Sequence, residues 1–338
     1  MAQVSNKVAA RPYLLIALVI SLGFSIYTAT RPSHEYPSNK PGPDVVIQVA
    51  QGEYGVSIAQ KLVKFGVIKE SSTFVALANK PNSAAQGISP GSHRIQTHIT
   101  SFMALEQLLD RKRFTNLVNV IDGSTFSDVL KELSKDSNVV KSGYGSVKPY
   151  FKNGRNSLEG QLAPASYTFG AQTSTSKALQ SMVDGFASSI KNISLERGFG
   201  KYSGYEVLTI ASMVQIEGDP SDYAKVAGVI YNRLKIGMPL QLNSTVQYAA
   251  GLRGQIALST KATQIDSAYN TYKHVGLPPT PISNPSLKAI KAALNPQFHP
   301  YLYFITVKPH DTRFTKDYSQ FDSWVTEYNK NRASGLFK

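Results

Sequence analysis

The chain has 338 residues, enough for two domains with substantial cores. It carries 36 Lys and Arg residues against 22 Asp and Glu residues, and the net charge of +14 favours an anionic partner such as nucleic acid, anionic lipid or an acidic polymer. The positive charges are scattered, so they do not by themselves predict a nucleic-acid-binding segment. There is no cysteine, which excludes disulfides and thiolate metal sites, and no H-x-x-x-H pair supports a metal site.

The N-terminus contains one long uncharged apolar segment, residues 12–30. As a helix it would span roughly 28 Å, close to the thickness of a bilayer core. Lys7 and Arg11 precede it and no acidic residue does. Because positive charge stays on the cytoplasmic side, residues 1–11 are predicted to be a cytoplasmic tail and the rest of the chain to lie outside the membrane.

A cleaved signal peptide is the alternative interpretation of this segment. Its cleavage site requires small residues at A-x-A spacing, whereas Ala29 is preceded two positions earlier by Tyr27. The pattern therefore favours an uncleaved, single-pass anchor. Residues 31–44 contain four prolines and are predicted to be an extended linker.

A short repeat follows the linker. The pattern of a strand, a glycine turn and an amphipathic helix recurs at an offset of 71 residues, as Val49, Gly52, Ile58, Ala59 and Leu62 and again as Val120, Gly123, Val129, Leu130 and Leu133. The repeat predicts a duplicated small α+β region over residues 45–134, and chance similarity of a common pattern is the alternative. Residues 135–338 are assigned to a second domain.

Apolar periodicity in the second domain predicts several elements. Helices are expected over 174–191, 204–217 and 221–237, a buried strand over 301–305 and a closing helix over 321–329. Glu217 is the last residue of the helix expected over 204–217. It continues the three- and four-residue spacing of the helix's apolar residues, so it lies at the edge of an apolar stripe. Both partial burial and the C-terminal end of a helix dipole raise the pKa of a carboxyl group, as a general acid near neutral pH requires. A surface glutamate that ends a helix is the alternative.

Several blocks in this domain resemble one family. Residues 208–217 (LTIASMVQIE) are similar to the signature L-x-x-A-S-I-V-(E/Q)-x-E of the YceG-like endolytic murein transglycosylases. Four further blocks match the family in order: 158–167 (LEGQLAPASY), 229–248 (VIYNRLKIGMPLQLNSTVQY), 267–272 (SAYNTY) and 276–285 (GLPPTPISNP). The resemblance covers roughly residues 45–330.

The resemblance implies a fold class and a function. The fold is expected to be α+β, with the N-terminal transmembrane helix, small LysM-like α+β units over 45–134 and a mixed α/β catalytic domain over 135–338. The expected activity is non-hydrolytic cleavage of peptidoglycan glycan strands after N-acetylmuramic acid, leaving 1,6-anhydro ends. No cofactor or metal is expected. The implied setting is the cytoplasmic membrane with the catalytic domain outside it, beside cell-wall elongation enzymes and without nucleic acid.

The resemblance and the chemistry of the side chains together nominate site residues. Glu217 is the predicted catalytic carboxylate, and the predicted substrate-binding residues are Gln241, Asn243, Tyr269, Asn270, Tyr272 and Glu159. The sequence departs from the family pattern at Ala165, Asn243, Thr280, Thr312 and Phe321. These departures motivate an alternative function, a peptidoglycan-binding scaffold with weakened catalysis.

Ordinary glycosidases use two carboxylates, and no second acid has a claim comparable to that of Glu217. Glu159 is the best outside candidate, although a structural hydrogen bond beside Gly160 is the favoured interpretation of this residue. One carboxylate suffices if the 6-hydroxyl of the muramic acid attacks in place of water. A serine hydrolase is not supported, because the sequence has no G-x-S-x-G motif and no S-x-x-K motif accompanied by its partner motifs.

Overall fold

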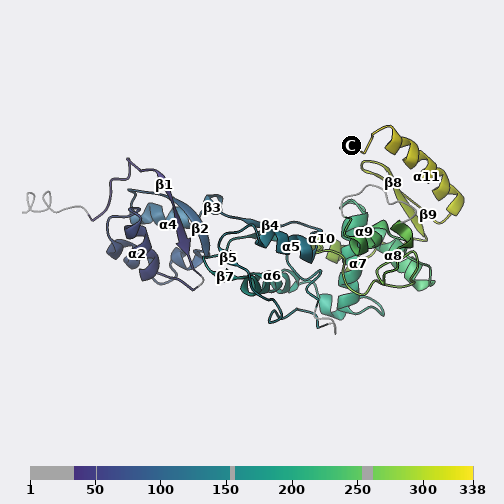
Figure 1. Ribbon diagram of the computed structural model, residues 1–338, viewed down its shortest axis with the longest axis horizontal. Coiled ribbons are helices and arrows are strands. Elements are labelled where there is room, and N and C mark those ends of the chain that lie inside the picture. Colours follow the sequence, from purple (N-terminus) through teal and green to yellow (C-terminus); the bar gives the residue numbers. More distant parts are fainter. Residues whose placement is uncertain (1–33, 51, 153–156, 253–261, 338) are drawn as a thin grey trace, which may run out of the picture. The chain divides into compact units, whose positions relative to one another are not determined.

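A computed structural model describes residues 34–337 except 51, 153–156 and 253–261 (Figure 1). The chain divides into two compact units, Met1–Phe114 and Thr115–Lys338, called unit 1 and unit 2 below. This division corrects the domain boundary expected at 134, because the second copy of the repeat belongs to unit 2. The predicted membrane span, 12–30, lies outside the described residues. Among the residues that the structure describes, no helix is long and apolar enough to cross a membrane.

Unit 1 is a small sheet covered by helices. Its elements are β1 (Asp44–Val49), α2 (Val56–Lys64), α3 (Ser71–Ala78), β2 (Gly91–Gln96), α4 (Ser101–Leu109) and β3 (Phe114–Thr115). The strands lie in the order β1-β2-β3, and β1 pairs antiparallel with β2 so that Ile47 faces His93. Ile47, Leu62 and Phe74 are fully buried in the core of this unit. The first half of unit 1 therefore has a strand-helix-helix-strand order closed by one antiparallel pair.

The local structure of the repeat is confirmed in both copies. Gly52 and Gly123 turn the chain between strand and helix with φ of 79° and 80°, values in the left-handed region that glycine adopts without strain. The tertiary surroundings of the two copies differ, because in unit 2 the strand β4 (Val118–Val120) pairs antiparallel with β6 (Ala165–Tyr167). The repeat therefore predicts the local conformation but does not predict the strand partner.

Unit 2 contains the remaining elements. Its helices are α5 (Phe126–Leu133), α6 (Thr175–Ile190), α7 (Gly204–Glu217), α8 (Tyr223–Lys235), α9 (Asn243–Ala250), α10 (Leu287–Leu294) and α11 (Tyr318–Ala333). Its other strands are β5 (Val139–Val140), β7 (Thr173–Ser174), β8 (Tyr303–Lys308) and β9 (Asp311–Thr315). The helices expected from the sequence are confirmed within a few residues at each end, whereas α9, α10 and β9 were not foreseen. The strand expected at 301–305 is half-buried, because β8 pairs in a hairpin with β9 only.

Helix α7 lies at the centre of the larger core of unit 2. Ser203 caps its N-terminus, and Ser203 and Glu206 exchange hydrogen bonds in a capping box. Residues 207–214 are all buried, so the helix packs on every side rather than along one stripe. It contacts α8 and α10, and Gly218 ends it (Figure 1). This packing fixes the position of Glu217, its last residue.

A buried polar strap, residues 280–284, crosses α7 and connects it to the rest of unit 2. Ile282 N–H donates to Ser212 Oγ at 3.0 Å, and Ser283 Oγ donates to the Ser212 carbonyl at 3.0 Å. Asn284 accepts from Leu162 N–H at 2.9 Å through Oδ1 and donates to the Ser124 carbonyl at 2.9 Å through Nδ2. The strap therefore ties the centre of α7 to two loops of the α5–α6 region.

Asn284→Ala is expected to lower the free energy of unfolding by about 2 to 3 kcal/mol, because it leaves the buried N–H of Leu162 without its acceptor. Urea denaturation followed by circular dichroism measures the change. Asn295→Ala is the control, since the Asn295 side chain makes an exposed hydrogen bond to its own helix. Equal stability of the two variants would contradict the role of the strap.

Candidate active site

Glu217 lies where the end of α7 meets the beginning of α9. Its Oε1 accepts a hydrogen bond from the backbone N–H of Ser244 at 3.1 Å, and Ser244 is in the first turn of α9. The residue is partly exposed to a cavity of about 480 Å³. This volume lies in the range of small-molecule binding pockets.

The groups around Glu217 shift its pKa in opposite directions. Burial raises its pKa above the ordinary glutamate value, and this is the largest effect. Hydrogen bonding from Ser244 and the positive charge of Arg233 both act in the opposite direction. The net pKa is raised, so Glu217 keeps its proton to higher pH than a free glutamate and still has groups nearby that stabilise its anion.

Three of the predicted site residues share this cavity with Glu217, namely Gln241, Asn243 and Tyr272. Tyr272 donates a hydrogen bond from its hydroxyl to Asn243 Oδ1 at 2.7 Å. Gln241 is exposed and has a φ of 48°, a left-handed conformation that is uncommon for a residue other than glycine. Residues that lie 24 to 55 positions after Glu217 in the sequence are thus brought together by α8, α9 and the 270–272 loop.

Asn270 does not line the cavity. It is fully buried, and its Nδ2 donates to the carbonyls of Thr263 and Ile265 at 3.0 and 2.8 Å. Its Oδ1 accepts from the backbone N–H of Tyr272 at 3.0 Å. The structure therefore corrects its expected role: Asn270 shapes the loop that carries Tyr272 and does not face the space where a substrate would bind.

Glu159 and Tyr269 lie at a separate cavity of about 550 Å³, apart from Glu217. Glu159 is buried, and its two oxygens accept from the N–H of Phe126, the first residue of α5, at 3.0 and 3.1 Å. Its Oε2 also accepts from the Tyr248 hydroxyl at 3.0 Å. A carboxylate at a helix N-terminus stabilises that helix, so the structural interpretation of Glu159 is favoured over substrate binding.

A second wall of the Glu217 cavity was not predicted. It comes from the C-terminal hairpin, α11 and the residues after α11, and it is mostly aromatic, with Tyr303, Phe304, Tyr318, Phe321, Tyr328 and Phe337. Phe321 stacks on Tyr303 with ring centroids 5.3 Å apart. The two walls therefore differ in chemistry, since one carries polar groups and the other carries flat apolar rings. A sugar ring has hydroxyl groups at its edge and an apolar face, so the two walls together suit a sugar.

Arg233 is another residue of the cavity that the sequence did not single out. It is buried in α8, where Nε donates to the Leu302 carbonyl and Nη1 to the Leu240 carbonyl, both at 2.6 Å. Its guanidinium carbon also lies 5.4 Å from the centroid of the Tyr303 ring. Arg233 thus joins the two walls of the cavity and places a positive charge beside Glu217. The N-R-L part of the matched block was the available signal for this residue.

The departures from the family pattern fall in different places. Phe321 belongs to the aromatic wall, and the Thr312 hydroxyl is hydrogen-bonded at 2.9 Å to that of Thr306, which lines the cavity. Thr280 is buried in the strap, with its hydroxyl 2.8 Å from that of Tyr269. Ala165 is exposed in β6 opposite Val120. Asn243, Thr312 and Phe321 therefore alter the cavity or its supports, whereas Ala165 and Thr280 do not line it.

Comparisons with known proteins agree with this arrangement. The model of the YceG-like family matches residues 47–327. The chain belongs to the YceG-like family. A protein of Bacillus subtilis (strain 168) named endolytic murein transglycosylase is 35% identical over 234 residues, which cover 69% of this chain and 62% of that protein. A protein of the same name from Streptococcus pneumoniae (strain R6) is 42% identical over 159 residues, which cover 45% of this chain and 28% of that protein.

A solved structure supports the fold of this YceG-like protein. The crystal structure of a putative YceG-like protein from Listeria monocytogenes superimposes with a TM-score of 0.54 at 25% identity, covering 83% of this chain and 98% of that one. The aligned region spans less than two thirds of the length of the curated relatives.

Among the described residues, no group of three or more His, Asp or Glu side chains is arranged to hold a metal ion.

Glu159→Gln is expected to lower the free energy of unfolding by about 1 to 2 kcal/mol, because the neutral amide loses the charge-assisted contact with the start of α5. Activity per folded molecule should not change. Thermal and urea denaturation measure the first effect and an activity assay the second. Glu132→Gln in the same helix is the control, because Glu132 is half-buried and forms only a surface ion pair with Lys135. Loss of activity with unchanged stability would show that Glu159 takes part in substrate binding or catalysis.

Substitution of Arg233 is expected to change the pH dependence of the reaction. Arg233→Met removes the charge that stabilises the Glu217 anion, so the pKa of Glu217 and the alkaline limb of activity should move up by about one pH unit. Arg233→Lys keeps the charge and should leave that limb in place while turnover falls, since lysine cannot bridge both carbonyls in the same way. Circular dichroism checks folding. Identical pH profiles for all three proteins would contradict this role.

Proposed function

We propose that this YceG-like protein is an endolytic murein transglycosylase that cleaves peptidoglycan glycan strands with Glu217 as its single catalytic carboxylate. The observation that carries the proposal is the position of Glu217, the one carboxylate among the described residues that line the cavity. It has a raised pKa, accepts a hydrogen bond from the start of α9 and shares its cavity with an aromatic wall. The names of the curated relatives supply the substrate class.

The first half of the proposed reaction is general-acid catalysis. Protonated Glu217 donates its proton to the glycosidic oxygen as the bond from that oxygen to C1 of N-acetylmuramic acid breaks. The leaving strand departs with a free hydroxyl, and positive charge develops at C1. Glu217 is now a carboxylate, and both the Ser244 N–H and the charge of Arg233 stabilise it.

The second half uses the same carboxylate as a base. The 6-hydroxyl of the muramic acid attacks C1, and its proton passes to Glu217, which restores the starting form of the enzyme. The product ends in 1,6-anhydro-N-acetylmuramic acid, and no water is consumed. Because the nucleophile belongs to the same sugar, its effective molarity is high, and a second carboxylate to activate water is not needed.

The setting of the enzyme is part of the proposal. Residues 12–30 would anchor the chain in the cytoplasmic membrane as a single span with residues 31–338 outside. The strand-helix-helix-strand order of unit 1 is compatible with a LysM-like module that contacts glycan. In this setting, cleavage would end nascent strands beside the enzymes that elongate them.

A scaffold of the cell-wall synthesis machinery is the second candidate function. The observation in its favour is that Phe321 and Asn243, two departures from the family pattern, both line the Glu217 cavity. A scaffold would bind murein and leave it intact. The cleavage assay below separates the two candidates.

Digestion of purified murein by the whole chain is expected to yield fragments with anhydro ends, and Glu217→Gln should lower the rate by at least about a thousandfold because glutamine cannot transfer the proton. Mass spectrometry of the fragments identifies the ends. Glu196→Gln, an exposed glutamate of the same unit, is the control and should keep full activity. Reducing ends in the product would show that water is the nucleophile. Intact murein with every protein would favour the scaffold.

The pH dependence provides a further check on the same residue. Since only protonated Glu217 can act as the acid, the rate should fall as pH rises through its pKa. Burial raises that pKa, so the fall should lie above the range of an ordinary glutamate. Initial rates measured across the pH range would show the pH at which the rate falls. A fall within the ordinary glutamate range would mean that burial does not govern the acid.

A further inference from the structure

Unit 2 has a further concave region, at the end of α7 opposite Glu217. Two cavities of about 520 and 370 Å³ share Lys201 and Tyr202 there, and together they are called the Tyr202 groove below. Lys201 and Tyr202 precede the N-cap of α7, whereas Glu217 is the last residue of that helix. At 1.5 Å per residue, roughly 20 Å separates the two ends, so the groove is distinct from the Glu217 cavity.

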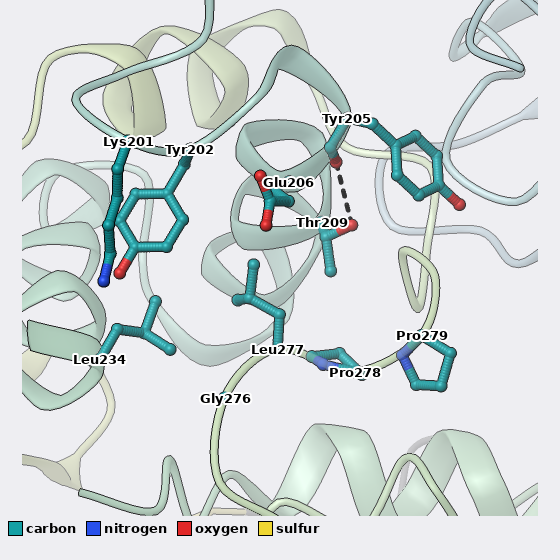
Figure 2. Close-up of a pocket in the computed structure, with 10 residues that line it drawn as sticks. All are labelled: Lys201, Tyr202, Tyr205, Glu206, Thr209, Leu234, Gly276, Leu277, Pro278 and Pro279. Carbon is teal, nitrogen blue, oxygen red and sulfur yellow. Dashed lines mark hydrogen bonds between the residues drawn. The ribbon is translucent and has the colours of Figure 1, made fainter. Parts of the chain in front are cut away.

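The first cavity of the groove combines flat apolar surfaces with one acid. Figure 2 shows Lys201 and Tyr202 side by side at one end and Pro279 towards the other, with the Glu206 carboxylate between them above Leu277. One oxygen of Glu206 accepts the capping hydrogen bonds from the N–H and hydroxyl of Ser203 at 2.7 and 2.8 Å. The acid is therefore held in a fixed place at the cavity.

The second cavity is more aromatic. Phe199, Tyr202 and Tyr231 contribute rings to it, and Phe298 stands at its edge with 87% of its surface exposed. The Tyr231 hydroxyl donates to the Ala293 carbonyl at 2.9 Å, which holds that ring in place. Phe298 thus adds an exposed apolar face to the three rings that line this cavity.

The charges of the groove are not neutralised by the fold. Lys201 and Lys235 line it, both are exposed, and neither forms an ion pair in the part of the chain that the structure describes. The Lys201 ammonium lies 5.5 Å from the centroid of the Tyr202 ring. The groove thus presents two cations, one anion and several flat rings to whatever binds there.

We propose that the Tyr202 groove binds a second segment of the murein strand, namely a disaccharide with its stem peptide. This inference rests on the proposed function. The apolar faces of the amino sugars would stack on Tyr202 and Phe298. The carboxylates of the stem peptide would pair with Lys201 and Lys235, and an ammonium group of the peptide's diamino acid would pair with Glu206.

The shape and charge of the groove favour this occupant over a lipid surface. A bilayer contacts a convex or flat patch of apolar and basic residues, whereas these cavities are concave and the first contains the carboxylate of Glu206. A strand held both here and at Glu217 would be bound at two points, which raises its apparent affinity over that of a short oligomer. The groove would therefore favour long strands over short ones.

The test compares two double variants of the full chain. Phe298→Ser with Lys235→Ala alters exposed side chains of the groove, and Ile121→Ser with Lys131→Ala alters an exposed apolar residue and an exposed lysine elsewhere in unit 2. For each, kcat/KM is measured on long uncrosslinked strands and on a short oligomer. The groove variant should lose about tenfold on long strands and keep its value on the oligomer, whereas the control should match the wild type on both.

A binding measurement separates failure of this inference from failure of the proposed function. With Glu217→Gln in both backgrounds, sedimentation with purified sacculi should show about tenfold weaker binding for the groove variant than for the control. This result would stand even if the wild type cleaved nothing. Equal binding and equal kcat/KM on long strands would overturn the inference. Loss of binding to anionic phospholipid vesicles with unchanged binding to sacculi would assign the groove to a membrane instead.

Discussion

The burial of residues 207–214 of α7 on all sides is the constraint on which the rest of unit 2 depends. A helix packed on all sides cannot rotate or slide without opening the core, so its last residue has a fixed position. The polar strap reinforces this position through Ser212, whose hydroxyl and carbonyl are both used. Glu217 therefore enters the cavity from a rigid support, which a residue that transfers protons to a bound substrate requires.

The charge of Glu217 is controlled by the meeting of two helix ends. The C-terminus of α7 disfavours a negative charge, whereas the N-terminus of α9 offers the N–H of Ser244 to it. Burial decides the outcome and raises the pKa, and Arg233 limits the rise. One side chain can therefore donate a proton and take it back, and this is the physical basis for a mechanism with a single carboxylate.

Under the proposed function and the proposed role of the Tyr202 groove, unit 2 would separate chemistry from recognition along the length of α7. Its C-terminal end carries the acid, the polar wall and the aromatic wall, and its N-terminal end carries the Tyr202 groove. A polymer substrate suits such an arrangement, because its repeating units can occupy both ends of one helix at once. The same helix then sets the spacing between the two regions.

Much of the local structure could be predicted from the sequence. The run of apolar and small residues that ends before Gly218 predicts α7, and the repeated glycines predict the two strand-turn-helix segments. Short elements such as α9 and β9 could not be predicted, because their conformation depends on neighbours supplied by distant parts of the chain. The family resemblance pointed to Glu217, but similarity of motifs does not say which residues of a motif face the cavity.

The sequence by itself determined the family, the candidate acid and most of the helices, because periodicity and motif spacing are properties of the linear chain. Only the tertiary structure decided the roles of Asn270, Glu159 and Arg233. Asn270 is buried behind the cavity, and Glu159 is bound to the start of α5. Arg233 joins the carbonyls of Leu240 and Leu302, which lie 62 residues apart in the chain. A side chain's role depends on which groups surround it, and those groups come together only when the chain folds.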